Sequence, residues 1–363
     1  MMENKEIYVL SAKQITIQQP LSEAWMQEPI LYEVPFARSI DPSFKDYVSP
    51  IEARRMGKIL KRAIATSKEA LKASGLPTVD AIVTGTGYGC VENTEFFLEA
   101  LSKEGEQLLK PTYFMQSTHN TISSLVAIQT KNYGYNATYA QKGVSFESAL
   151  HDAWLQFRLG KIGSALIGGH DEMTETFYHI LKKGGMMGRD EERCAEASVS
   201  VVLASGSRFE EAQSLSRTLC GGNNPEIQPL CKLTGFKMLH QPTKEVLKDA
   251  VALMLQEAGK RLSDVSFILT GISGDHDSDA AYFEETKRLF GDKPLLKYKP
   301  LFGESFAASG VGFYVAAQCL KAQYVPKTLF VNSLEENVNQ LDSILLFSHS
   351  DGKDYTLTLM ERQ

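Results

Sequence analysis

The stretch from Gly134 to Leu159 constrains the fold of this chain more than any other. Residues 134–140 alternate in the manner of a β-strand, the chain turns sharply at Gly143, and apolar residues then recur at helical spacing from Val144 onward. In many enzymes such a strand-to-helix turn, called the elbow below, exposes a nucleophile. Here its tip carries glycine, which has no side chain. The elbow therefore predicts either a lost activity or a different role.

Composition excludes several classes of protein. The 363 residues are 43% hydrophobic and 23% charged, which is ordinary for a soluble globular protein. A formal net charge of -6 argues against nucleic acid or an anionic membrane as the main partner. The N-terminus lacks the features of a signal peptide, and no apolar run reaches the roughly 18 residues of a spanning helix. We therefore expect a cytoplasmic protein.

No pattern in the chain is typical of a metal or cofactor site. The five cysteines are scattered without CxxC spacing, as expected of reduced thiols. The Gly-rich turn at residues 85–89 lacks the last glycine of a dinucleotide fingerprint and any Walker lysine. The acidic run at residues 275–279 lacks the glycine and final glutamate of a calcium loop, so we predict a solvated turn that caps a helix. We expect no cofactor and no metal.

Strand and helix patterns alternate along the chain, which predicts an α/β fold with helices covering largely buried sheets. An amphipathic helix is expected over residues 51–74, ended by Gly75, and another over residues 279–290 with Asp279 as its N-cap. Strands are expected at residues 81–85, 164–169, 197–204, 265–271 and 329–331, among others. The second part of the chain repeats the pattern of the first. We place the halves at residues 1–210 and 211–363, with the change between residues 210 and 241.

The region from Pro111 to Gly169 resembles the β-ketoacyl-acyl-carrier-protein synthases of the thiolase-like superfamily. Residues 111–120, Pro-Thr-Tyr-Phe-Met-Gln-Ser-Thr-His-Asn, are similar to the family's proline-aromatic stretch with its Ser-Thr pair. Aligned without gaps, the catalytic cysteine of the family's Thr-Ala-Cys falls on Gly143, and its glycine pair on Gly168 and Gly169. Chain-length factors carry glutamine in the cysteine position. Matching Gln141 to it would shift this register, so we treat Gln141 as a coincidence.

Two further family motifs have counterparts here. The family's His-Gly-Thr-Gly-Thr corresponds to Gly-Ile-Ser-Gly-Asp at residues 271–275, so the first catalytic histidine position is Gly271. Its Lys-x-x-x-Gly-His corresponds to residues 299–304, so Lys299 is kept and the second histidine position is Glu304. The family's C-terminal Gly-Phe-Gly-Gly turn corresponds loosely to residues 348–352. We expect Lys299 and Glu304 to form a buried ion pair.

The resemblance implies a thiolase-like fold, with two similar α/β halves in a layered αβαβα sandwich, and a changed function. Decarboxylative condensation needs a thiol nucleophile and donors that stabilise an enolate. Gly143 supplies no thiol, Gly271 supplies no donor, and an ionised Glu304 has the wrong charge. We expect a β-ketoacyl synthase-like protein of fatty acid or polyketide biosynthesis that is inactive in condensation alone, similar to chain-length factors. Residues 145–150 are similar to synthase-like proteins of aryl-polyene pigment pathways.

The resemblance also implies the partners. We expect a dimer through the strand at residues 136–140, with an active ketosynthase as the other subunit and acyl carrier protein docking on the pair. The loop at residues 111–119 would reach toward the partner's tunnel. Phe114, Met115 and Phe146 are the residues we expect to line the acyl channel.

Two alternatives stay open. One is an active acyltransferase or hydrolase of the same superfamily that uses Ser145 or Cys90 as nucleophile, with His119 as the nearest base for Ser145. A helix N-cap is the simpler role for Ser145, and a buried thiol is the simpler role for Cys90. The other alternative is a homodimeric acyl-binding protein without a catalytic partner.

Overall fold

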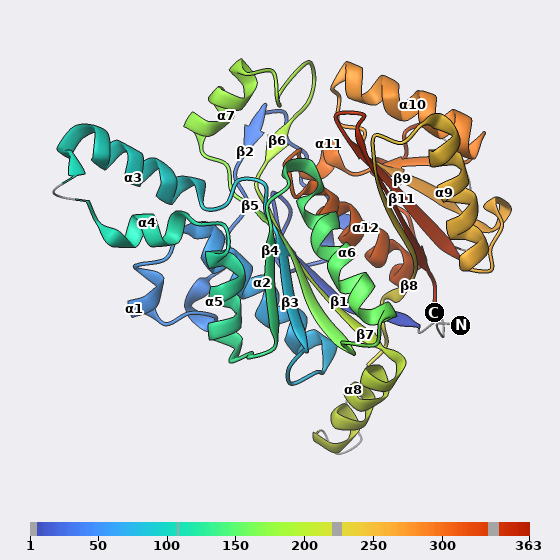
Figure 1. The fold of residues 1–363 in the computed structure, drawn as a ribbon, viewed down its shortest axis with the longest axis horizontal. Coiled ribbons are helices and arrows are strands. Elements are labelled where there is room, and N and C mark those ends of the chain that lie inside the picture. The colour runs from blue at the N-terminus through green and yellow to red at the C-terminus, as the bar shows by residue number, and fades with distance from the viewer. Residues whose placement is uncertain (1–5, 107–108, 220–226, 333–340) are drawn as a thin grey trace.

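The computed structural model describes residues 6–106, 109–219, 227–332 and 341–363. Cys220 and most of the glycine-rich stretch after it lie outside these ranges. A ten-stranded mixed sheet runs through the molecule, with helices on its faces (Figure 1). The α/β expectation is confirmed. In the part of the chain that is described, no helix is long and apolar enough to cross a membrane.

The sheet consists of two sets of strands with the same order and the same directions. In each set the first two contacts are antiparallel and the last two are parallel. The first set runs β1 (Ile7–Ile15), β7 (Ala197–Ser205), β5 (Ser164–Asp171), β3 (Ala81–Gly85), β4 (Tyr135–Tyr139). The second runs β8 (Cys231–His240), β12 (Asp354–Glu361), β11 (Ser343–Ser350), β9 (Phe267–Thr270), β10 (Leu295–Lys297). A short antiparallel contact between β1 and β8 joins the sets.

Two helices occupy equivalent places in this repeat and lie between the two sets of strands. Helix α6 (Ser145–Arg158) leads into β5, and α12 (Ala308–Ala322) leads into β11. Helix α12 contacts β1, β5 and β7 of the first set and β8, β9, β11 and β12 of the second. Nearly all of α12 is buried, because its Gly and Ala residues let strands approach from both sides.

Both faces of the central strands are buried, as the layered arrangement requires. Along β11, Ile344 and Leu346 belong to the core around α6 and α12, whereas Leu345 and Phe347 belong to the core under the outer helices. Successive side chains of a strand point to opposite faces, so one apolar run fills two cores. The boundary at residues 210 and 211 falls within α8 (Gly206–Leu219) and stays a prediction.

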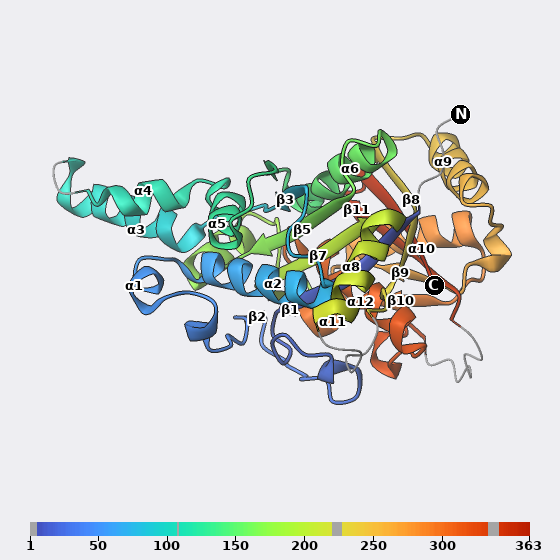
Figure 2. The same cartoon turned by 90° about the horizontal axis from the view of Figure 1, so that it is seen from below.

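The outer helices cover the remaining faces of the sheet. Helices α2 (Lys58–Ser74) and α5 (Thr121–Thr130) pack on the first set, and α9 (Lys244–Glu257) and α10 (His276–Phe290) on the second. Helices α3 (Val91–Glu104) and α4 (Pro111–Ser117) project together away from the body (Figures 1 and 2). The short elements are α1 (Pro50–Ala53), α7 (Glu175–Lys183), α11 (Lys299–Phe302), β2 (Phe36–Ala37) and β6 (Cys194–Ala195).

One helix boundary and one strand predicted from the sequence are wrong. The helix predicted over residues 51–74 is two helices, because α1 ends at Ala53 and Gly57 takes an extended backbone as the N-cap of α2. Its end is as predicted, since Gly75 has a φ of 71°, which suits glycine. The strand predicted over residues 329–331 is a 3-10 turn with a single bridge between Leu296 and Phe330.

Candidate functional site

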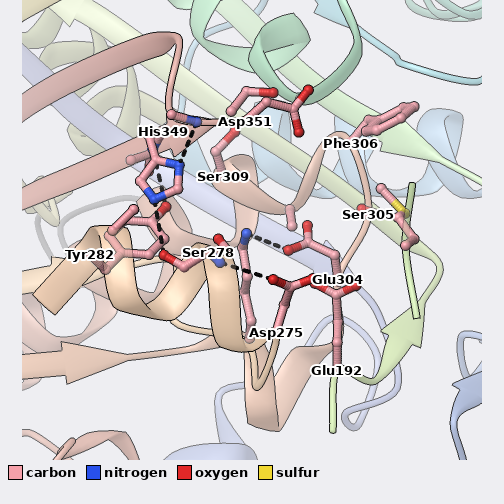
Figure 3. A pocket seen from close by; sticks show the side chains of 18 of the residues that line it. Glu192, Asp275, Ser278, Tyr282, Glu304, Ser305, Phe306, Ser309, His349 and Asp351 are labelled. Carbon is pink, nitrogen blue, oxygen red and sulfur yellow. Dashed lines mark hydrogen bonds and ion pairs between the residues drawn. The ribbon is translucent and has the colours of Figure 1, made fainter. Parts of the chain in front are cut away.

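A pocket of about 360 Å³ lies beside the elbow and is lined by residues from both halves of the chain. Gly143 and Glu147 contribute from the first half, and Lys299, Glu304 and His349 are among those from the second. Figure 3 shows His349 and Tyr282 on one side of this pocket and Glu304, Ser305 and Phe306 on the other. Residues that are far apart in the sequence therefore meet here.

The tip of the elbow is closed by a serine from another element. Between β4 and α6 the chain makes a 3-10 turn over Lys142–Val144, in which Lys142 has a φ of 49°. A Cβ built on Gly143 would lie 2.7 Å from Ser350 Oγ and 3.2 Å from its Cβ. The space in front of Gly143 is therefore occupied by the hydroxyl of Ser350.

The position at the end of β9 is closed in the same way. A Cβ built on Gly271 would lie 2.3 Å from Tyr282 Oη and 3.1 Å from Lys299 Cε. Tyr282 Oη accepts a hydrogen bond from the backbone N–H of His349 at 3.1 Å. This role of Tyr282 could not be predicted from the sequence, because an aromatic residue inside an amphipathic helix predicts only a core position.

Lys299 and Glu304 form the buried ion pair that the sequence predicts. Lys299 Nζ donates to Glu304 Oε2, and each side chain is 12% exposed. Burial acts to lower the pKa of Lys299, but the carboxylate of Glu304 raises it, and the net shift is upward. Burial raises the pKa of Glu304 to about 7, against the opposing effect of Lys299. Lys299 is therefore positively charged, and the carboxylate that pairs with it lines the same pocket.

Glu147, in the first turn of α6, is a buried carboxyl that the sequence analysis did not single out. It accepts hydrogen bonds from Ser309 Oγ at 2.8 Å and from Thr356 Oγ1 at 3.3 Å. Burial raises its pKa to about 7. Its neighbours in sequence form an ordinary helix start, so only the packing of α12 and β12 against α6 makes this glutamate unusual.

His349 has both ring nitrogens engaged. Nε2 donates to the carbonyl oxygen of Ser278 at 3.3 Å, and Nδ1 accepts from the backbone N–H of Gly352 at 3.3 Å. The ring lies over Tyr282, with 4.0 Å between the ring centroids. Burial lowers the pKa of His349 to about 4. This histidine is therefore neutral at physiological pH and has no free nitrogen to act as a base.

The acidic run at residues 275–279 caps a helix, as predicted, but it is only partly solvated. Asp275 is 2% exposed, caps α10 by accepting from the Ser278 N–H at 2.9 Å, and pairs with Arg189 at 2.5 Å. The helix therefore begins at His276, and Asp279 is not its N-cap. Asp279 instead accepts from the backbone N–H groups of Ser273 and Gly274, each at 2.9 Å. Through these hydrogen bonds, residues 275–279 hold the loop that follows β9 in place.

The two alternative nucleophiles do not line the pocket. Ser145 is fully buried, accepts from the Gln141 N–H at 2.9 Å and donates to the Lys142 carbonyl at 2.7 Å, which closes the turn of the elbow. Val144, not Ser145, is the N-cap of α6. Cys90 is also fully buried, and burial raises the pKa of its thiol. His119 is exposed and makes no hydrogen bond with Ser145.

The residues expected to line an acyl channel do not line this pocket. Phe146 is 1% exposed and packs against Phe313 in the core between the sheets, with Gly169 beside it, and its assignment to an acyl channel stays a prediction. Phe114 and Met115 lie on α4 and are 58% and 68% exposed. Their contact with a partner stays a prediction. Across the described ranges, no group of three or more His, Cys, Asp or Glu residues is placed to hold a metal ion.

Comparison with known proteins gives the family. A family model described as "Beta-ketoacyl synthase, N-terminal domain" matches residues 23–245, which is more than half of the chain. The chain belongs to the β-ketoacyl synthase family. It is 22% identical over 325 residues to 3-oxoacyl-[acyl-carrier-protein] synthase 2 of Mycobacterium leprae, covering 82% of this chain and 75% of that protein. The protein of the same name from Mycobacterium tuberculosis is 22% identical over 316 residues, covering 82% and 76%.

Solved β-ketoacyl synthase structures share the whole fold. The ishigamide ketosynthase/chain length factor has a TM-score of 0.77 at 15% identity and covers 99% of this chain and 100% of its own. A β-ketoacyl synthase from Burkholderia phymatum STM815 has a TM-score of 0.78 at 16% identity, covering 99% and 100%. A type II polyketide synthase acyl-carrier protein in complex with its ketosynthase bound to the hexaketide gives 0.76 at 16%, again covering 99% and 100%. The thiolase-like expectation is confirmed.

Proposed function

We propose that this β-ketoacyl synthase homologue is a condensation-inactive subunit that works beside an active synthase, in the manner of a chain-length factor. One observation carries the proposal. The positions that the resemblance assigns to the nucleophile and the first histidine are glycines, and other side chains close the space in front of them. Ser350 lies at Gly143, and Tyr282 at Gly271.

The chemistry of condensation supports the same conclusion. No cysteine among the described residues lines the pocket, and Cys90, Cys194, Cys231 and Cys319 are all buried. A Claisen step needs donors at the oxygen where negative charge develops, and loss of one such donor costs about 10²–10³ in rate. Glu304, when ionised, would oppose that charge. The chain has the scaffold of a synthase without the groups that perform the step.

Strand β4 offers the surface for an active partner. It is the last strand of the sheet, so one of its edges has no partner strand among the described residues. The Tyr135 N–H donates to Asp80 on the side of β3. Because alternate residues of a strand face opposite sides, the Asn136 N–H points outward. Exposed apolar residues lie nearby, with Ile128 at 66% and Tyr133 at 95%. We propose that this edge pairs with the same edge of an active ketosynthase, and that acyl carrier protein docks on the pair.

Co-expression tests the proposal. The chain is produced with the cysteine-containing ketosynthase encoded nearest to it in its genome, and complex formation and product length are measured. We expect a heterodimer, and we expect product length to change when this chain is left out. The proposal fails if no heterodimer forms and product length is independent of the chain. A homodimer that purifies with bound lipid would instead support the acyl-binding alternative.

A matched pair of variants tests the edge itself. Asn136→Pro removes the outward N–H, whereas Asn136→Ala keeps it and loses only the side-chain bond to the Ser123 carbonyl. We expect the proline variant to lose the heterodimer and the alanine variant to keep it, as judged by size-exclusion chromatography with light scattering. Retention of the heterodimer by both variants would place the interface elsewhere.

A further inference from the structure

Three residues that line the pocket each carry a buried hydroxyl group without a hydrogen-bond partner among the described residues. These groups are Tyr298 Oη, Ser305 Oγ and Ser348 Oγ, on side chains that are 1%, 3% and 7% exposed. Leaving a buried polar group unpaired costs roughly 1–3 kcal/mol, so native proteins rarely do so. Three such groups around one pocket point to a ligand that supplies their partners.

The charges that line the pocket favour a cation over an anion. The residues that line the pocket include six carboxyl groups and two side chains that are permanently positive. Both cations are already paired, Lys299 with Glu304 and Arg189 with Asp275. His349 is neutral because burial lowers its pKa to about 4. The carboxyl groups are Glu147, Glu192, Asp275, Asp277, Glu304 and Asp351.

Glu147 is the carboxyl that a cationic ligand would satisfy. It is 2% exposed, and its hydrogen-bond donors are two neutral hydroxyls, those of Ser309 and Thr356. Within the described chain no Lys, Arg or His side chain forms an ion pair with it. Lys299, whose positive charge acts to lower the pKa of Glu147, is itself paired with Glu304. A buried carboxylate is stabilised when an N–H cation donates to it, because that contact replaces its lost hydration.

The remaining lining limits the size and nature of the ligand. Met187, Phe306 and Ala308 line the same pocket and offer an apolar wall. A water molecule occupies about 30 Å³ of the liquid, so a pocket of about 360 Å³ holds on the order of a dozen non-hydrogen atoms. A short apolar stem with one charged end fits these walls.

We propose that this pocket binds a small primary ammonium compound with a short apolar stem, whose ammonium group donates to Glu147 and to the unpartnered hydroxyls. The binding is a property of this chain alone and does not depend on the proposed pairing with an active synthase. Loss of the heterodimer and loss of ligand binding are therefore separate results.

Isothermal titration calorimetry with three probes of equal stem length tests the ligand class. We use n-butylamine, 1-butanol and butyrate at about pH 8, where the amine is protonated and Glu147, with its pKa of about 7, is mostly ionised. We expect saturable binding of n-butylamine, weaker binding of 1-butanol and none of butyrate. Butyrate binding as tightly as n-butylamine, or no saturable binding of the amine, overturns the proposal.

Three variants locate the contact. Glu147→Gln keeps the shape but removes the charge, and we expect it to weaken n-butylamine binding by about tenfold or more. Tyr298→Phe removes a hydroxyl that has no partner in the described chain, so its fold is preserved and we expect binding to weaken about threefold. Glu172→Gln is the control, since Glu172 is also a buried carboxyl but lies outside the pocket lining. Unchanged affinity in both pocket variants overturns the proposal.

Discussion

The hydroxyl of Tyr282 lies where a side chain on Gly271 would begin, since a Cβ built on Gly271 would be 2.3 Å from Tyr282 Oη. Tyr282 comes from α10, and its oxygen also accepts from the backbone N–H of His349. The two positions are therefore coupled, because Tyr282 Oη in this place leaves no room for a side chain at position 271. A larger residue at position 271 requires the tyrosine to move, and the tyrosine holds the last residues of β11 through His349.

We expect Gly271→Ala to lower the free energy of unfolding by about 1–3 kcal/mol, because the new methyl group overpacks a filled site. Adding Tyr282→Phe removes the oxygen that the methyl group meets, so the double variant should be more stable than the sum of the two single changes predicts. Denaturant unfolding of the four proteins measures this. Gly206→Ala is the control, since its Cβ would meet only Tyr8 at 4.0 Å. If the losses of unfolding free energy in the two single variants simply add in the double variant, the contact between position 271 and Tyr282 Oη is contradicted.

We expect Gly143→Cys to leave condensation absent, because a thiol alone does not supply donors for the enolate. The new side chain would also crowd Ser350, so the melting temperature should fall, and Ser350→Gly in the same chain should recover part of that loss. Release of carbon dioxide from malonyl-carrier protein and thermal unfolding are the measurements. Condensation by the single variant would mean that the other two positions are not needed.

We expect Lys299→Met to destabilise the fold by about 3–5 kcal/mol, because Glu304 is then left buried without a partner. The double variant Lys299→Met with Glu304→Gln should recover most of this loss, since both charges are removed. Lys103→Met is the control, because it breaks the exposed pair with Glu99 and should have no measurable effect. Wild-type stability of Lys299→Met would show that the buried pair is dispensable for folding.

We expect stability to fall as the pH rises. Burial raises the pKa of Glu147 to about 7 and that of Glu172 to about 8, from an ordinary value of 4.5. Burial also raises the pKa of Asp171 to about 6 and of Glu304 to about 7, whereas it lowers the pKa of His170 to about 3 and of His349 to about 4. The raised carboxyls outnumber the two histidines, so the folded state binds more protons than the unfolded state between about pH 4.5 and 8, and the free energy of unfolding decreases through that window.

Glu147→Gln should remove its share of this pH dependence, roughly 3 kcal/mol at most between about pH 5 and 9. Denaturant unfolding across that range measures the effect. Glu284→Gln is the control, because Glu284 is exposed and Lys244 lowers its pKa. An unchanged pH slope in Glu147→Gln would show that Glu147 titrates normally in the folded chain.

The sequence could predict much of the fold because local patterns carry it. Period-2 and period-3.6 alternation of apolar residues marks strands and helices wherever each element buries a regular face. Boundaries were harder, as the split at Gly57 shows. That break lies inside a pattern that remains helical on both sides, and the extended backbone of one glycine decides it.

In the candidate site, too, some residues could be predicted from the sequence and others could not. Motif spacing predicts that Gly143 and Gly271 stand at catalytic positions and that Lys299 is retained, and it also predicts the pairing of Lys299 with Glu304 that the structure contains. The roles of Tyr282, Glu147 and Ser350 could not be predicted, because each becomes part of the site only through packing against an element that is distant in the chain. The same packing places Phe146 in the core, and its predicted place in an acyl channel is still to be tested.

By itself the sequence determined that the chain keeps a ketosynthase scaffold and lacks a nucleophile at Gly143, since covalent identity and spacing along the chain record both. Only the tertiary structure decided what occupies the space that those losses leave. Ser350 and Tyr282 reach Gly143 and Gly271 across separate elements, and three buried hydroxyls converge on one pocket with Glu147. Proximity between distant elements depends on how the layers pack, and no local pattern encodes it.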